Sequence, residues 1–195
     1  MKKYGIFGGT FNPPHIAHSI LGENIREQLD LDKIIFIPSG NPPLKISIPS
    51  HHRLAMARLA FSDNQYFEVS DIELKDQEVK SYTVNTLSEL SQKFVNDNVK
   101  LFLFIGADNF INLDKWKDPE RLFEFAEVIV LNRPDNNIND HTSGFKDKVK
   151  FIDTPLLEIS SSMIRERILK GLSVKYLIDE KVEDYIIKNG LYKNP

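Results

Sequence analysis

The sequence predicts an α/β fold in which helices cover both faces of a doubly wound, mostly parallel sheet. Three observations support this prediction: short apolar runs recur along the chain, stretches with helical periodicity separate them, and several runs are apolar at nearly every position. Continuous apolar runs are typical of strands that are buried on both faces. Alternation of strands and helices favours parallel pairing, because each helix carries the chain back across the sheet.

The predicted strands are short runs of aliphatic and aromatic residues. Each is bounded by glycine, proline or charged residues, which is typical of strand ends. In chain order we expect strands at Lys3–Phe7, Lys33–Ile37, Phe67–Ile72, Leu101–Ile105, Glu127–Leu131 and Val149–Ile152.

Helical periodicity occupies most of the intervals between these runs. Ser50 is placed to cap the second helix. In chain order we expect helices at His15–Leu29, His51–Phe61, Thr83–Phe94, Met163–Lys170 and Glu180–Lys188, the last two forming a C-terminal helical segment. Residues 38–49 and 132–144 are rich in proline, asparagine and other turn residues and are expected to be loops.

Size and composition set the class of protein. The 195 residues fit one domain, which we expect to span residues 1–195. A net charge of −3 gives no general attraction to nucleic acid or to an anionic membrane. The chain has no cysteine, and no apolar run approaches the roughly 18 residues that would cross a bilayer. We therefore expect a cytoplasmic, soluble protein without a thiolate metal site.

The segment Gly8–His18 follows the first predicted strand and opens the first predicted helix. A strand, a glycine turn and a helix start form an anion site, because free backbone N–H groups converge there. We expect Asn12 to cap the helix, Pro13 or Pro14 to lie in its first turn, and His15 and His18 to face one pocket. The alternatives are an ordinary tight turn and structural histidines. The glycine spacing does not match the G-x-G-x-x-G pattern of dehydrogenases.

The segment Ile159–Arg167 is a second candidate for binding phosphate. Ser160, Ser161 and Ser162 precede a helical run and supply ordinary capping residues. Arg165 opposes the helix dipole unless an anion lies between it and the backbone amides; the alternative is a solvated surface residue. Serine hydroxyls, N–H groups and arginine would together bind phosphate, so the two helix starts could hold one triphosphate.

These two segments resemble the signatures of bacterial nicotinate-nucleotide adenylyltransferases, within the HxGH nucleotidyltransferase superfamily. The resemblance continues through Ser81-Tyr82-Thr83, Gly106-Ala107-Asp108, Trp116, Arg133-Pro134, Tyr176-Leu177 and Val182-x-x-Tyr185-Ile186, so it covers nearly the whole chain. The chain departs from the family pattern at four positions. These are Ala17 for glycine, Leu44 for histidine, Asn85 for aspartate and Ser162 for threonine.

The resemblance implies a single Rossmann-like nucleotidyltransferase domain that transfers AMP from ATP to nicotinate mononucleotide in NAD biosynthesis. The implied catalytic residues are His15, His18 and Arg165. The implied ATP-binding residues are Gly8, Gly9, Thr10, Phe11, Lys45, Ile159, Ser160 and Ser161. The implied nicotinate-mononucleotide-binding residues are Thr83, Asp108, Trp116 and Arg133. Mg²⁺ is expected to arrive bound to ATP, with no metal site on the protein.

Several alternatives stay open at this stage. Trp116 could be a packing residue and Asp108 a helix cap. Pantetheine-phosphate adenylyltransferase and a non-catalytic nucleotide sensor are the competing functions. A class I aminoacyl-tRNA synthetase would need an anticodon domain, and a nucleic-acid-binding module would need a basic surface. Preference for nicotinate over nicotinamide is undecided, and so is oligomeric state, with a homo-oligomer as one option.

Overall fold

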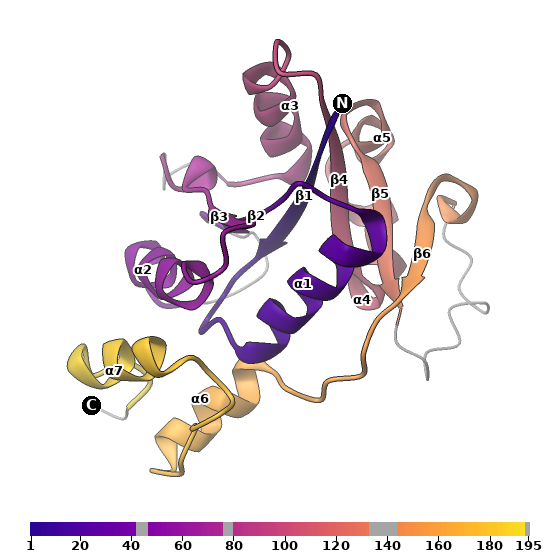
Figure 1. Cartoon of the computed structure of the whole chain (residues 1–195). Helices are drawn as coiled ribbons and strands as arrows, with labels where there is room; N and C mark the ends of the chain where they lie inside the picture. The colour runs from indigo at the N-terminus through magenta and orange to yellow at the C-terminus, as the bar shows by residue number, and fades with distance from the viewer. Residues whose placement is uncertain (42–46, 76–79, 133–143, 194–195) are drawn as a thin grey trace.

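The fold is a six-stranded parallel sheet with strand order β3-β2-β1-β4-β5-β6 (Figure 1). The computed structural model describes residues 1–41, 47–75, 80–132 and 144–193. All five neighbouring strand pairs are parallel. The strands are β1 (Lys2–Gly9), β2 (Lys33–Pro38), β3 (Phe67–Val69), β4 (Val99–Gly106), β5 (Glu127–Asn132) and β6 (Lys150–Asp153).

All six predicted strands are confirmed, but the third is shorter than expected. β3 ends at Val69, and Ile72–Leu74 forms a turn of 3-10 helix (η1) instead of continuing the strand. The Ser70 N–H still donates to the Phe36 carbonyl at 2.9 Å, whereas the Ser70 hydroxyl accepts from the Ile72 N–H at 3.3 Å. A serine side chain that bonds its own backbone two residues later turns the chain. This turn removes Ile72 from the sheet.

The five predicted helices are also confirmed. They are α1 (Ile16–Leu29), α2 (Ser50–Phe61), α3 (Thr83–Lys93), α6 (Ser161–Leu169) and α7 (Glu180–Lys188). The capping role predicted for Ser50 is wrong, because α2 begins at Ser50 itself and Pro49 precedes it. Two short helices, α4 (Ala107–Ile111) and α5 (Leu122–Phe125), were not predicted. They are too short to show helical periodicity in the sequence.

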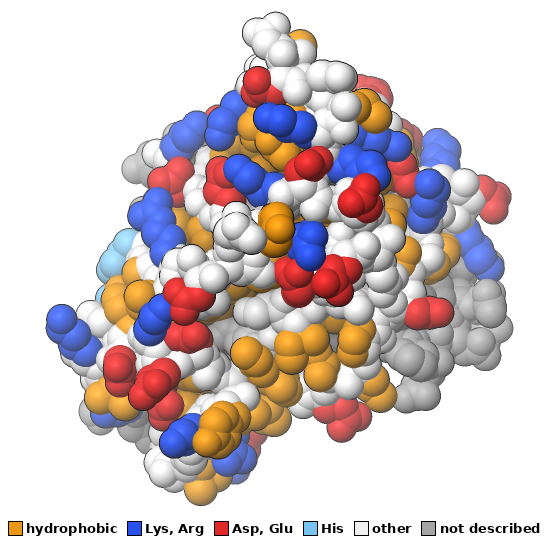
Figure 2. Space-filling view, in the orientation of Figure 1, with side chains coloured by type: hydrophobic (Ala, Val, Ile, Leu, Met, Phe, Trp, Pro, Cys, Tyr) orange, Lys and Arg blue, Asp and Glu red, His pale blue; other side chains and the backbone are white. Residues whose placement is uncertain are grey.

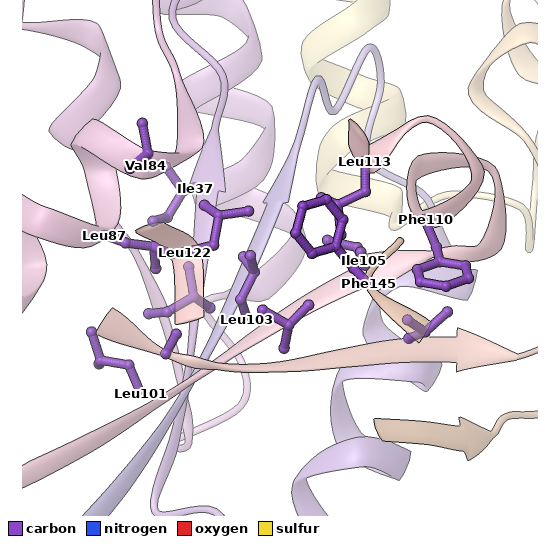
Figure 3. Close-up of a cluster of buried hydrophobic side chains, with 14 of the residues drawn as sticks. Ile37, Val84, Leu87, Leu101, Leu103, Ile105, Phe110, Leu113, Leu122 and Phe145 are labelled. Carbon is purple, nitrogen blue, oxygen red and sulfur yellow. The ribbon is translucent and has the colours of Figure 1, made fainter. Parts of the chain in front are cut away.

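The core lies in two layers, one on each face of the sheet. On the first face, alternate residues such as Ile35, Leu103 and Val128 pack with Leu87 of α3 and Phe110 of α4. Figure 3 shows Leu87, Leu103 and Phe110 of this cluster. On the other face, their neighbours Ile34, Phe104 and Ile129 pack with Ile25 of α1 and Phe61 of α2. Because successive side chains of a strand point to opposite faces, continuous apolar runs fill both layers.

The C-terminal segment forms a third apolar cluster against α2. Met56 of α2 packs with Ile164 of α6 and with Val182 and Ile186 of α7. In Figure 1, α6 and α7 lie beside the N-terminal end of α1, although they come from the opposite end of the chain. None of the helices in the described ranges has both the length and the apolar character needed to cross a membrane.

Candidate active site

The predicted site lies where the strand order reverses. β2 and β3 extend the sheet on one side of β1, whereas β4, β5 and β6 extend it on the other. β1 and β4 are parallel neighbours, so their carboxyl ends open at the same edge. Ligands in doubly wound sheets bind outside the carboxyl ends of strands at such a reversal. The segment that follows β1 therefore lies at the switch point of the sheet.

Two cavities lie at this edge, on opposite faces of the sheet. The tryptophan cavity has a volume of about 280 Å³ and includes Leu87 and Leu103 of the α3 layer in its lining. The histidine cavity has a volume of about 290 Å³ and includes Phe7 and Leu131 of the α1 layer. Gly8 lines the first cavity and Gly106 the second, and a Cβ atom at either would meet no other atom within 4 Å. The backbone at both strand ends is therefore open to a ligand.

His15 and His18 lie together in the lining of the histidine cavity, as predicted. Their ring centroids are 3.7 Å apart. The His15 backbone N–H donates to Nδ1 of His18 at 3.1 Å, and the ring of Phe11 packs edge-on against His18 with centroids 5.0 Å apart. The hydrogen bond and the aromatic contact hold the His18 ring in one orientation.

The environment keeps both imidazoles neutral. Burial lowers the pKa of His15 from 6.5 to about 4. Burial, with repulsion from His15 as a second cause, holds the pKa of His18 well below its usual value. Because Nδ1 of His18 accepts a hydrogen bond, the proton of the neutral ring is on Nε2. His18 therefore offers the histidine cavity an uncharged N–H donor.

The loop between β1 and α1 differs from its prediction. Gly8 and Gly9 end β1 instead of forming a turn, and the turn falls at Phe11, with φ of 48°. The buried Phe11 ring packs in the core against Phe36 and Phe61 and lines neither cavity, within the described residues. This core packing stabilises a backbone conformation that is uncommon for phenylalanine.

The expected cap of α1 is also wrong. His15, not Asn12, is the N-cap residue, and both prolines precede the helix. A residue before proline is driven out of the helical region, so consecutive prolines delay the helix start. The Ile16 N–H donates to the Leu177 carbonyl at 3.0 Å and is therefore not free to bind an anion.

The start of α6 reaches the histidine cavity through Ile159, Ser160 and Ser161. The two predicted phosphate-binding segments thus meet in one cavity. The Ser160 hydroxyl caps the helix by accepting from the Met163 N–H at 3.2 Å. The Ser161 hydroxyl donates to the Pro13 carbonyl at 2.8 Å.

Arg165 connects the two segments instead of lining the cavity between them. Its Nη1 donates to the Asn12 carbonyl at 2.8 Å, and its Nη2 donates to the Ser162 hydroxyl at 3.2 Å. It is not among the residues that line the histidine cavity in the described part of the chain. A guanidinium has five N–H donors, so donors remain for an anionic ligand.

The tryptophan cavity contains two of the residues predicted to bind the second substrate, Thr83 and Trp116. Gly8, Gly9 and Thr10 line the same cavity, although the sequence assigned them to ATP. The sequence missed Ser39, Glu73 and Lys117 as lining residues, because they come from three separate segments that only the fold brings together. The Ser81 hydroxyl is buried there and has no hydrogen-bond partner among the described residues.

The other predicted site residues lie elsewhere. Asp108, which the resemblance grouped with Thr83 and Trp116 as a nicotinate-mononucleotide residue, lines the histidine cavity and not the tryptophan cavity. Lys45 and Arg133 lie outside the described residues, as do Leu44 and His141. Of the remaining histidines, His52 contacts the Tyr185 hydroxyl at 2.9 Å, away from both cavities.

Two residues that support the site, Arg53 and Tyr192, could not be recognised from the sequence. Arg53 of α2 is 1% exposed, and its guanidinium donates to the carbonyls of Thr10, Gly40 and Ile48. The Tyr192 hydroxyl donates to Oδ1 of Asn12 at 2.8 Å. The Arg53–Thr10 and Tyr192–Asn12 bonds join residues 43 and 180 positions apart, a separation that periodicity does not reveal.

Charge on the surrounding surface is mixed. Lys and Arg side chains are interspersed with Asp and Glu side chains over the upper half of the face in Figure 2, and hydrophobic side chains gather below. Attraction of a polyanion therefore depends on the local site. Among the described residues, no group of three or more His, Asp or Glu side chains is placed to hold a metal ion.

Comparisons with known proteins agree with this geometry. A family model described as cytidylyltransferase-like matches residues 6–167. A protein of Lachnoclostridium phytofermentans, named probable nicotinate-nucleotide adenylyltransferase, is 41% identical to this chain. The alignment covers 98% of this chain and 100% of the relative. A protein of the same name from Dictyoglomus turgidum is 44% identical, with 97% of this chain and 95% of the relative covered.

A solved structure has the same fold. The nicotinic acid mononucleotide adenylyltransferase of Plasmodium falciparum, complexed with NaAD, superposes with a TM-score of 0.79 over 98% of both chains at 22% identity. The relatives, the family model and this fold agree over nearly the whole chain. The chain therefore belongs to the cytidylyltransferase-like family and, within it, to the nicotinate-nucleotide adenylyltransferases.

Proposed function

We propose that the protein transfers AMP from ATP to nicotinate mononucleotide, producing nicotinate adenine dinucleotide and pyrophosphate for NAD biosynthesis. One observation carries the proposal: a cavity with two neutral histidines and a cavity with a tryptophan both lie at the carboxyl ends of β1 and β4. A dinucleotide consists of two nucleotides joined through phosphates, so it fits two cavities at the same edge of the sheet. The named relatives and the P. falciparum complex agree with this assignment.

ATP is assigned to the histidine cavity. His15, His18, Ile159, Ser160 and Ser161 line it, and the N-terminal end of α6 supplies backbone N–H groups. Asp108 lies in the same lining and is reassigned from nicotinate mononucleotide to the ATP side. Arg165 has donors to spare at the start of α6, and Lys45 is proposed as a further phosphate contact from the loop before α2.

Nicotinate mononucleotide is assigned to the tryptophan cavity. Trp116 provides a flat surface on which a pyridine ring stacks, and Thr83 provides a hydroxyl. Gly8, Gly9 and Thr10 line this cavity next to the histidine pair and are proposed to contact the reacting phosphates. Arg133, which follows β5, is proposed as a further contact to a phosphate or carboxylate.

The reaction needs positioning and charge stabilisation more than a side-chain base. An oxygen of the nicotinate mononucleotide phosphate is already ionised at neutral pH and attacks the α-phosphorus of ATP. A new P–O bond forms as the bond to the bridging oxygen breaks, and that electron pair leaves with pyrophosphate. The Nε2–H of His18 can donate to an α-phosphate oxygen as charge develops. Mg²⁺ enters as part of the Mg-ATP substrate, with few ligands from protein.

The test is pyrophosphate release from Mg-ATP with three acceptors supplied separately. Nicotinate mononucleotide should support turnover much better than nicotinamide mononucleotide or phosphopantetheine. Equal use of the nicotinamide form would show that the tryptophan cavity does not select the acid. Activity with phosphopantetheine alone would replace the proposal by the pantetheine-phosphate reaction, and no activity with any acceptor would favour a nucleotide sensor.

A further inference from the structure

The loop that presents the histidine pair is held almost entirely by residues far away in the sequence. The Thr10 carbonyl accepts from Arg53, the Asn12 carbonyl from Arg165, and the Pro13 carbonyl from the Ser161 hydroxyl. These are contacts to the loop backbone. Tyr192 differs, because its hydroxyl contacts a side chain of the loop, that of Asn12.

Asn12 accepts two of these four contacts. It is 7% exposed, its carbonyl is bonded to Arg165 and its side-chain oxygen is bonded to Tyr192. His15 follows three residues later and is 8% exposed. A shift of Asn12 therefore moves the N-cap of α1 and with it the His15 N–H that orients His18.

The backbone conformation of the C-terminal segment places the Tyr192 hydroxyl next to the Asn12 side chain. Gly190 and Tyr192 have φ values of 61° and 62°, and Leu191 between them is buried in the α7 cluster. A tyrosine at positive φ is a strained conformation that the surrounding packing must maintain. Burial raises the pKa of the Tyr192 hydroxyl far above its usual range, so it remains a donor at any physiological pH.

We propose that Tyr192 is a positioning residue for the reaction: its hydroxyl holds Asn12 and thereby keeps His15 and His18 aligned for the phosphates. Tyr192 does not itself line either cavity in the described residues, so it acts through Asn12. This inference rests on the proposed function, since the histidine pair is proposed to donate hydrogen bonds to the phosphates. Misplacement of a catalytic group by even 1 Å costs a large part of the rate.

The experiment compares Tyr192→Phe with Tyr185→Phe. Both variants remove one hydroxyl from the C-terminal segment and keep the ring; Tyr185 contacts His52 at 2.9 Å, away from the cavities. Tyr192→Phe should lower kcat about tenfold with the KM for nicotinate mononucleotide unchanged. Tyr185→Phe should leave kcat unchanged, while the melting temperatures of the two variants fall by similar amounts. Equal kcat in the two variants, or a kcat loss that follows melting temperature, would overturn the inference.

A double mutant tests the route through Asn12. Asn12→Ala removes the acceptor, so adding Tyr192→Phe to it should slow turnover no further. Independent, multiplicative losses would show that Tyr192 acts by another path.

NMR separates failure of this inference from failure of the proposed function, because it does not require turnover. Tyr192→Phe should shift the imidazole signals of His15 and His18, whereas Tyr185→Phe should shift those of His52 and of His51, whose ring lies against it, and leave His15 and His18 unmoved. Unmoved His15 and His18 signals would overturn the role of Tyr192. A wild-type protein that is inactive with nicotinate mononucleotide but shows the expected shifts would overturn the proposed function alone.

Discussion

The two cavities at the strand ends are built on different principles. In the histidine cavity three side chains are bonded to the protein itself: His18 to the His15 N–H, Ser160 to Met163, and Ser161 to Pro13. The buried Nδ1 of His15 in the same lining has no partner among the described residues. In the tryptophan cavity the buried Ser81 hydroxyl has no partner among the described residues. The His18 ring is held in one orientation, as a donor to charge that develops in the proposed reaction requires. Nδ1 of His15 and the Ser81 hydroxyl are left to be satisfied by the ligand of each cavity. The comparison suggests that chemistry and recognition are divided between the two faces of the sheet.

The most direct way to break this division is His18→Ala. Loss of a donor to developing charge should lower kcat by about 10²- to 10³-fold and leave the KM for nicotinate mononucleotide unchanged. Stability should fall by about 1 kcal/mol, because the His15 N–H loses its acceptor. Steady-state kinetics and urea unfolding measure both effects. A raised KM with normal kcat would place His18 in recognition and contradict the division.

Acid should act on the histidine cavity and leave the tryptophan cavity largely unaffected. The pKa of His15 is about 4 in the folded protein and 6.5 in the unfolded chain, so below pH 6.5 the unfolded state binds more protons. Stability should therefore fall as the pH drops from 6.5 towards 4, by about 3 kcal/mol for His15 alone.

Urea midpoints across this pH range measure the loss. His15→Gln should flatten the dependence, and ATP should offset part of the loss, because phosphates favour protonated imidazoles. A dependence as steep in His15→Gln as in wild type would assign the acid sensitivity to other groups.

Trp116→Ala should sharpen the comparison from the other side. Loss of stacking costs about 1–3 kcal/mol, so the KM for nicotinate mononucleotide should rise about 5- to 150-fold. The KM for ATP should not change, because Trp116 lines only the tryptophan cavity. Initial rates with each substrate varied in turn provide the measurement, and an equal rise in both KM values would show that the cavities do not act separately.

Ser81→Ala should give the smallest effect. An unpaired buried hydroxyl contributes nothing to the free protein, so the free energy of unfolding should stay the same or increase slightly. If the ligand satisfies this hydroxyl, the KM for nicotinate mononucleotide should rise about fivefold, corresponding to one hydrogen bond. Loss of stability with an unchanged KM would show that Ser81 has a partner within the protein.

Much of the fold could be predicted because its signals are local. The apolar runs of β1, β2 and β4 show directly that both faces of the sheet are covered. The two predicted phosphate-binding segments, Gly8–His18 and Ile159–Arg167, were expected to act together. Residues from both line one cavity: His15, His18, Ser160 and Ser161. Here the sequence was sufficient, because strands and helix starts are marked by neighbouring residues, whereas the strand order came only from the structure.

The details of the phosphate site could not be predicted in the same way. Arg165 and Ser161 were expected to face phosphate, but in the structure they also bond the carbonyls of Asn12 and Pro13. Asp108 was expected to bind nicotinate mononucleotide together with Trp116, but the two residues line different cavities. The first difference concerns which nearby acceptors a donor reaches, and the second concerns the face of the sheet on which a side chain lies. A one-dimensional pattern has no information on either.

The sequence by itself determined the class of fold, the edge of the sheet at which the site lies and the family. It did so because strand alternation, helix-start chemistry and motif spacing are properties of neighbouring residues. Only the tertiary structure decided that the site has two cavities on opposite faces and that Arg53 and Tyr192 hold the histidine loop. These features depend on hydrogen bonds between residues far apart in the chain, which exist only after the core has brought the segments together.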